Sequence, residues 1–296
     1  MSTKTGQNAV VAAGDPALAL DLTVLESPAS LAHHLLAASG TVVVRPDVSD
    51  DMGSALFHRP GAPLSEEDTA HLWRRTGSRV VAHALVPGTP HFANAVVHDG
   101  RLVITDCWRC FTLEEGVRTI LTSVINVASD SPLLPRLTTE LEKVVKAAGI
   151  TDGPVHFELV VAEHVTKVVK FARRQAASPL PELCDLLGIP GQHGALTTGR
   201  PVALADTGHP GFVADYSFIV RTPGRFAGVI GLAELLARPS YAGTERIPEP
   251  ETLLEPSLDE NATFVLWLRH QDEATVLADI AHYHSRNREG VFALAD

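Results

Sequence analysis

The segments that decide the fold are Gly153-Pro-Val-His-Phe-Glu-Leu-Val-Val161 and, nine residues later, Lys170-Phe-Ala-Arg-Arg174. Both lie in apolar stretches that predict two neighbouring strands. Because strand side chains alternate between the two faces of a sheet, His156 and Glu158 lie on the same face. Lys170 lies on the next strand, and we expect its ammonium group to form an ion pair with the Glu158 carboxylate across the two strands.

Outside these segments, short apolar runs alternate with stretches of helical period. Pro87-Gly88-Thr89 and Asp99-Gly100 predict turns between three strands that pair in sequence order. Residues 1–20 are small and polar and predict a flexible tail. The predicted strands cover residues 41–46, 79–85, 92–97, 102–105, 155–161, 166–171, 216–221, 225–230 and 263–268, and the predicted helices cover residues 27–40, 65–73, 133–148, 180–187 and 272–287. Antiparallel strands mixed with packing helices indicate the α+β class.

Several motifs stand in a fixed order along the chain: Thr41-Val-Val-Val-Arg-Pro46, Leu85-Val-Pro-Gly-Thr89, Val103-Ile-Thr-Asp-Cys-Trp-Arg-Cys110, Gly153-Pro-Val-His-Phe-Glu158 and Gly228-Val-Ile-Gly-Leu-Ala-Glu-Leu235. In this order they resemble the ATP-grasp superfamily, in particular its L-amino-acid-ligase-like branch of carboxylate–amine ligases from peptide natural-product pathways. The resemblance implies an ATP-grasp fold, with a reduced small subdomain over residues 21–78 and a large subdomain with a C-terminal extension over residues 79–296. The family normally begins with a separate α/β domain, which we expect this chain to lack.

The resemblance also locates the nucleotide site. In the family, a Glu on one strand and a Glu-x-Asn on the next hold two Mg²⁺ ions against the ATP phosphates. Glu158 matches the first position, but Lys170 and Ala172 stand at the second pair. A cation at a metal-ligand position opposes Mg²⁺, which is held by carboxylates and phosphates. Arg45 stands where the family has its phosphate-binding Lys. His83 stands at the position of the hinge Glu, and Pro90 stands at the position of the ribose-binding Glu. The segment that matches the glycine-rich loop, residues 47–54, contains three acidic residues. The substitutions together predict the loss of ordinary ATP and Mg²⁺ binding, and no cofactor.

The residues that remain in the implied cleft form the candidate site. We expect catalytic roles for His156, Glu158, Lys170 and Arg174, and ligand-binding roles for Arg45, His83, His91, Trp108 and Arg109. The guanidinium groups of Arg109 and Arg174 suit a carboxylate or phosphate, or a structural ion pair. The spacing of the histidines brings no three metal ligands together, so no metal site is predicted. Cys107 and Cys110 have redox-motif spacing, but they follow a strand rather than opening a helix, and we interpret them as small strand residues.

Bulk properties limit the partners. The net charge of −11 disfavours nucleic acid and anionic membranes, both of which require a basic face. No apolar run approaches the roughly 20 residues that span a bilayer, and no signal layout opens the chain, so a cytoplasmic protein is expected. The apolar face left by a missing domain predicts either a homodimer or a partner enzyme of the same pathway. The homodimer interface is expected to include the segment from about Leu20 to Leu36 or the edge left by the missing domain.

Three functions fit these features. The first is an ATP-grasp-like protein of bacterial natural-product biosynthesis that has lost ATP and Mg²⁺ binding and uses the old cleft for ATP-independent chemistry or for a small amino-acid-like ligand. The second is an ATP-dependent carboxylate–amine ligase with ATP and Mg²⁺ in a rearranged metal site. The third is an oligomerisation or scaffold module. Whether the chain is an enzyme is left open by the sequence.

Overall fold

The computed structural model describes residues 3–48, 55–62, 64–74, 79–208, 210–256 and 263–295. Its helices are α1 (Lys4–Gly14), α2 (Pro28–Ala37), α3 (Glu66–Arg74), α4 (Leu133–Ala147), α5 (Leu180–Leu187), α6 (Gly191–Thr198), α7 (Leu232–Leu236) and α8 (Glu273–Glu289), with 3-10 turns at Pro16–Leu18 and Leu204–Asp206. Its strands are β1 (Thr23–Leu25), β2 (Val42–Pro46), β3 (Leu56–His58), β4 (Val80–Ala84), β5 (Thr89–His98), β6 (Arg101–Glu115), β7 (Arg118–Asn126), β8 (Gly153–Val161), β9 (Thr166–Ala172), β10 (Phe212–Phe218), β11 (Gly224–Val229), β12 (Tyr241–Arg246), β13 (Leu253–Leu254), β14 (Phe264–His270) and β15 (Phe292–Ala295).

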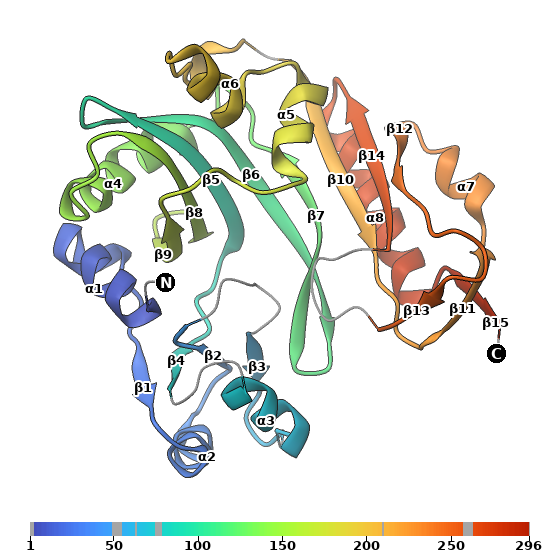
Figure 1. The fold of residues 1–296 in the computed structure, drawn as a ribbon, viewed down its shortest axis with the longest axis horizontal. Coiled ribbons are helices and arrows are strands. Elements are labelled where there is room, and N and C mark those ends of the chain that lie inside the picture. The colour runs from blue at the N-terminus through green and yellow to red at the C-terminus, as the bar shows by residue number, and fades with distance from the viewer. Residues whose placement is uncertain are drawn as a thin grey trace.

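One long antiparallel sheet runs through the molecule. Its strand order is β1-β4-β2-β3-β7-β6-β5-β8-β9, and β10, β14 and β12 extend it from β7. Figure 1 shows the strands β1 to β4 with α2 and α3 as a small lobe at the bottom, and the remaining elements as a large lobe above it. A separate small sheet, β13-β11-β15, lies at the C-terminal side. The architecture is the expected α+β class with antiparallel sheets and packing helices.

Each lobe has its own apolar core. The small-lobe core joins Leu31 and Leu35 of α2 to Val44, Leu56 and Leu72. In the large lobe, α4 packs against the sheet through its residues at helical spacing, as its sequence period predicted. A third cluster packs α8 against β10 and β14. Among the described residues, no helix is long and apolar enough to cross a membrane.

The structure corrects the expected flexible tail over residues 1–20. This segment forms α1 and a 3-10 turn, and Val11 and Leu18 are buried in the large-lobe core. A residue far away in the sequence stabilises the start of the helix, because the Asp47 carboxylate accepts hydrogen bonds from the backbone N–H and the hydroxyl group of Thr5. An anionic group at a helix N-terminus is stabilising, and the local sequence contained no sign of this partner.

Of the three strands expected to pair in order over residues 79–105, the second and third do so: β5 pairs with β6 across the Asp99-Gly100 turn, and β8 lies on the other side of β5. The expected pairing of the first strand is wrong, because β4 pairs with β1 and β2, and its Val80 and Ala82 lie in the small-lobe core. β6 is far longer than the predicted 102–105 strand and continues through the Cys-Trp-Arg-Cys segment to Glu115. The Pro87-Gly88 turn therefore connects the two lobes rather than two paired strands.

Candidate functional site

The centre of the site is an ion pair between β8 and β9. The two strands are antiparallel, and their register places Glu158 opposite Lys170. The Lys170 Nζ atom lies 3.0 Å from Glu158 Oε1, and the two side chains are only 6% and 12% exposed. The predicted cross-strand ion pair is confirmed.

The surroundings keep Glu158 ionised. Burial alone raises the pKa of a carboxyl group, but here the charge of Lys170 and its hydrogen bond act against burial, so that the pKa of Glu158 is lowered. Arg45 acts in the same direction. A buried carboxylate with an ammonium in contact is therefore the resting state of this position.

His156 is oriented by a buried chain of polar side chains. Its Nδ1 atom lies 2.7 Å from Asn94 Oδ1, and the Asn94 amide in turn donates to the Asp106 carboxylate. Burial is the largest effect on the ring and lowers the pKa of His156 to about 4, so the ring is neutral. Because Asn94 uses its NH₂ group on Asp106, its oxygen accepts from Nδ1–H, and the lone pair of His156 is on Nε2. That Nε2 atom lies 3.9 Å from Glu158 Oε1.

A cavity of about 340 Å³ opens beside His156 and Glu158 within the large lobe, and we call it the large-lobe cavity. Its charged and titratable lining consists of His156, Glu158, Arg174, Asp215, Glu245 and Arg246. Arg174 is exposed and donates to the Gln175 carbonyl at 2.8 Å. The structure thus brings three of the four predicted catalytic residues to one cavity. The fourth, Lys170, does not line this cavity but is in contact with Glu158, which does.

Asp215, on β10, is a member of this lining that the sequence did not reveal. Its Oδ1 atom accepts a 2.8 Å hydrogen bond from the backbone N–H of Val124. Burial raises the pKa of Asp215 to about 7, with the charge of Glu245 acting in the same direction. Asp215 and Glu245 lie on neighbours of β14, far from Glu158 in sequence, and no motif linked them to it. They add two acidic groups to a cavity that also holds arginines.

A second cavity of about 200 Å³ lies between the lobes, and we call it the interlobe cavity. It holds the predicted residues Arg45, His83, His91 and Lys170, together with Lys4 of α1. Most of the remaining lining is apolar, and includes Val43, Phe57, Leu85, Leu159 and Val169. Phe92, Leu121 and Glu158 line both cavities, so the two meet at the ion pair.

The other two predicted ligand-binding residues lie elsewhere. Trp108 is fully buried in the large-lobe core, and its indole N–H donates to Asp106 at 2.6 Å. Arg109 forms an ion pair with Glu273 of α8 at 2.7 Å and lines a shallow groove there. The structure places neither residue in the two cavities. Of the two roles expected for Arg109, ligand binding or a structural ion pair, the structure shows the ion pair.

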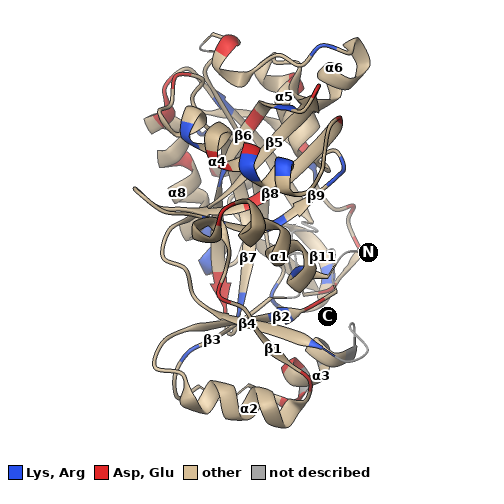
Figure 2. Cartoon of the chain, turned by 90° about the vertical axis from the view of Figure 1, so that its left-hand side faces the viewer, with Lys and Arg blue, Asp and Glu red and all other residues tan. Residues whose placement is uncertain are grey.

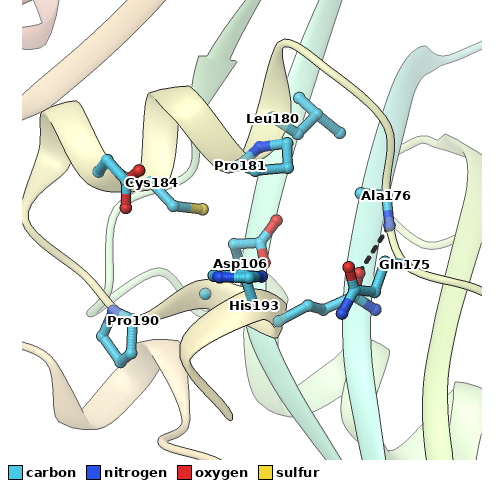
Figure 3. A pocket seen from close by; sticks show the side chains of 11 residues that line it. Asp106, Gln175, Ala176, Leu180, Pro181, Cys184, Pro190 and His193 are labelled. Carbon is cyan, nitrogen blue, oxygen red and sulfur yellow. Dashed lines mark hydrogen bonds between the residues drawn. The ribbon is translucent and has the colours of Figure 1, made fainter. Parts of the chain in front are cut away.

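The cysteines are structural. All three are buried and free, and burial raises the pKa of Cys107, Cys110 and Cys184. Cys184 lines a cavity of about 30 Å³ under α5 and α6, with Asp106 at its centre (Figure 3). This space holds about one water molecule. Since Asp106 also accepts a 3.0 Å hydrogen bond from Thr105, its carboxylate is well satisfied, and the small cavity belongs to the polar chain that orients His156.

The donors at the junction of the cavities do not fit a magnesium ion. Mg²⁺ prefers several oxygen ligands in octahedral geometry. Here Glu158 is the carboxylate in place, Lys170 occupies the facing position, and Ala172 lies opposite His156. Among the residues that the structure describes, no group of three or more His, Cys, Asp or Glu could hold a metal ion.

Comparison with solved structures shows the ATP-grasp fold. An L-amino acid ligase from Bacillus licheniformis superposes with a TM-score of 0.73 at 14% identity, over 99% of this chain and 72% of the ligase. N5-carboxyaminoimidazole ribonucleotide synthetase from Thermotoga maritima gives a TM-score of 0.61 at 14% identity, over 96% and 71% of the two chains. The biotin carboxylase domain of the 2-oxoglutarate carboxylase from Hydrogenobacter thermophilus gives 0.62 at 11% identity, over 100% and 67%. No family model and no curated protein matches the sequence.

Proposed function

We propose that this ATP-grasp protein binds a small amino-acid-like ligand in its large-lobe cavity without Mg²⁺ or ATP, as part of bacterial amino-acid or peptide natural-product biosynthesis. The observation that carries the proposal is the buried contact of 3.0 Å between Lys170 Nζ and Glu158 Oε1. In the fold, these positions correspond to metal ligands. The ammonium supplies one positive charge there permanently, so the site is neutralised before any metal arrives.

The charges of the cavity support an amino-acid-like ligand. Arg174 and Arg246 line it together with Asp215 and Glu245. A guanidinium group suits the carboxylate of such a ligand, and an acidic side chain suits its ammonium group. The volume of about 340 Å³ lies within the range of small-molecule sites. His156, with its Nε2 lone pair open toward Glu158, supplies an acceptor between the two charged ends.

The test is calorimetric titration of the protein with single L-amino acids and dipeptides in EDTA, repeated with Mg²⁺ in place of EDTA. The proposal expects at least one ligand to saturate the site, with the same affinity in both buffers. Arg174→Met should weaken that ligand roughly tenfold through loss of the carboxylate partner. Arg101→Met, a change at an exposed arginine outside both cavities, is the matched control and should leave the affinity unchanged. If no amino acid or dipeptide binds in EDTA, or if Mg²⁺ is required, the proposal fails.

The second candidate is an ATP-dependent ligase with a rearranged metal site. The meeting of the two cavities at Glu158 favours it, because a nucleotide between the lobes would then face a substrate in the large lobe. Such an enzyme must bind MgATP, so a nucleotide titration separates the two functions.

A further inference from the structure

The interlobe cavity contains two buried polar atoms that lack partners. Among the described residues, nothing hydrogen-bonds to Arg45 Nε or to His83 Nε2, and both atoms are out of contact with solvent. The side chains themselves are only 6% and 8% exposed, and both line the cavity. Buried polar groups in folded proteins are almost always satisfied, so two such atoms on side chains of one cavity wall require an explanation.

Arg45 brings a buried positive charge that has no carboxylate in contact among the described residues. Its one hydrogen bond runs from Nη2 to the Val169 carbonyl at a long 3.4 Å, and no ion pair of 4.0 Å or less joins it to a described residue. Burial lowers the pKa of Arg45 to about 10, with Glu158 opposing the shift, so the guanidinium stays charged at neutral pH. Glu158 is already in contact with Lys170. A buried cation without a close counterion is costly, and one negative charge from a ligand would offset that cost.

His83 brings an acceptor. Its Nδ1 atom lies 2.8 Å from the Ala84 carbonyl oxygen, which can only accept, so the proton is on Nδ1. Burial and the nearby Arg45 lower the pKa of His83 to about 4, which keeps the ring neutral at physiological pH. The Nε2 atom is therefore a lone-pair acceptor without a described donor, on a side chain that lines the cavity, and a hydroxyl or N–H group of a ligand would satisfy it.

The remaining lining of the interlobe cavity limits the polarity and the size of a ligand. Val43, Leu85, Phe92, Leu159 and Val169 make most of it apolar. The volume of about 200 Å³ is smaller than that of typical drug-sized sites. Lys4 and Lys170 also line the cavity, and Lys170 is already in contact with Glu158. A single carboxylate matches the guanidinium of Arg45, whose described contacts include no carboxylate.

From these features we infer that the interlobe cavity binds a small, mainly apolar organic acid that carries one carboxylate for Arg45 and one hydroxyl or N–H donor for His83. This site is separate from the amino-acid-like ligand of the large-lobe cavity, and it does not depend on that ligand. In this account Arg45 and His83 are specificity residues of a non-nucleotide site.

The experiment uses three pairs of aryl acids in EDTA: 4-hydroxybenzoate, 4-hydroxyphenylacetate and 3-(4-hydroxyphenyl)propanoate, each beside its analogue without the hydroxyl. The series varies the distance between the carboxylate and the donor. At least one hydroxy acid should saturate the protein in calorimetry and bind roughly tenfold more tightly than its analogue. ADP without Mg²⁺ is the competing ligand. If no hydroxy acid binds at millimolar concentration, or if ADP binds more tightly than every acid, the inference is overturned.

Variants then separate binding from structure. Arg45→Met should abolish the binding of the acid while Tm stays the same or rises, because the change removes a poorly solvated buried charge. A structural guanidinium would instead lower Tm on removal, and that result, with binding retained, contradicts the inference. His83→Phe should reduce the hydroxy acid to the affinity of its analogue. Arg174→Met lies in the other cavity and should leave the acid unaffected, which distinguishes this site from the proposed amino-acid-like site.

Discussion

The clearest energetic consequence of the site is the cost of removing Lys170. At a separation of 3.0 Å and an effective dielectric constant of about 20, the Coulomb attraction between Lys170 and Glu158 is about 5 kcal/mol. Lys170→Met leaves the Glu158 carboxylate buried without its contact partner, and we expect a loss of about 3 kcal/mol of unfolding free energy. The loss lies at the lower end of the range because Arg45 still favours the charged form of Glu158.

A double-mutant cycle measures the pair directly. Glu158→Gln alone strands the ammonium group and should cost a similar amount, whereas the double variant Glu158→Gln/Lys170→Met removes both charges and should cost about 1 kcal/mol or less. The coupling energy is then about 5 kcal/mol, close to the Coulomb value. Thermal unfolding should show each single variant lower in Tm by about 6–10 °C. Lys146→Met, at an exposed lysine of α4, is the control and should change little. A coupling below about 1 kcal/mol would refute the claim that this ion pair organises the site.

Three further results are expected. The raised pKa of Asp215 means that the folded state binds a proton that the unfolded state releases, so the stability that Asp215 contributes is present below about pH 4 and is lost as the pH rises toward 7. Asp215→Asn should remove this part of the pH dependence of the unfolding free energy measured in urea. Identical pH profiles for the variant and the wild-type protein would contradict the raised pKa. Asn94→Ala should destabilise the fold by about 2–3 kcal/mol, because it leaves the buried His156 Nδ1 without a hydrogen-bond partner and removes a donor to the Asp106 carboxylate. An unchanged unfolding free energy would show that the fold does not depend on this polar chain. Light scattering of the wild-type protein should return twice the chain mass of 31.6 kDa. Leu36 is 88% exposed on α2, a helix without Lys, Arg, Asp or Glu at the tip of the small lobe (Figure 2), and Leu36→Glu should return a monomer. A monomeric wild-type protein would shift the expectation to a partner enzyme.

The sequence predicted the ion pair at the centre of the site, because the motif order marked Glu158 and Lys170 as facing positions on two neighbouring strands. Strand alternation alone would not have placed them opposite each other, since a register shift between Glu158 and Leu159 brings Lys170, rather than Val169, opposite Glu158. The helix of residues 133–148 was predicted because it depends on local spacing. The order of the motifs also sufficed to identify the fold.

Long-range contacts account for what the sequence did not predict. The helix Lys4–Gly14 has a local N-cap, Thr3, but it also depends on Asp47, which accepts from the Thr5 N–H, and on α4, which packs against its side, and neither of these two partners is a neighbour in sequence. Trp108 resembled a cleft residue in its motif, but the long β6 buries it beside Asp106. Asp215 entered the cavity through the pairing of β10 with β14 and β7, which no local pattern encodes.

We propose that Lys170 stands in the place of a metal ion, and calorimetric titration with MgATP tests this proposal most directly. The wild-type protein should show no saturable heat at millimolar MgATP. The double variant Lys170→Glu/Ala172→Asn restores carboxylate and amide ligands opposite Glu158 and His156, and it should gain Mg²⁺-dependent heat. Micromolar binding of MgATP by the wild-type protein, abolished by EDTA, would contradict the account and favour an ATP-dependent ligase.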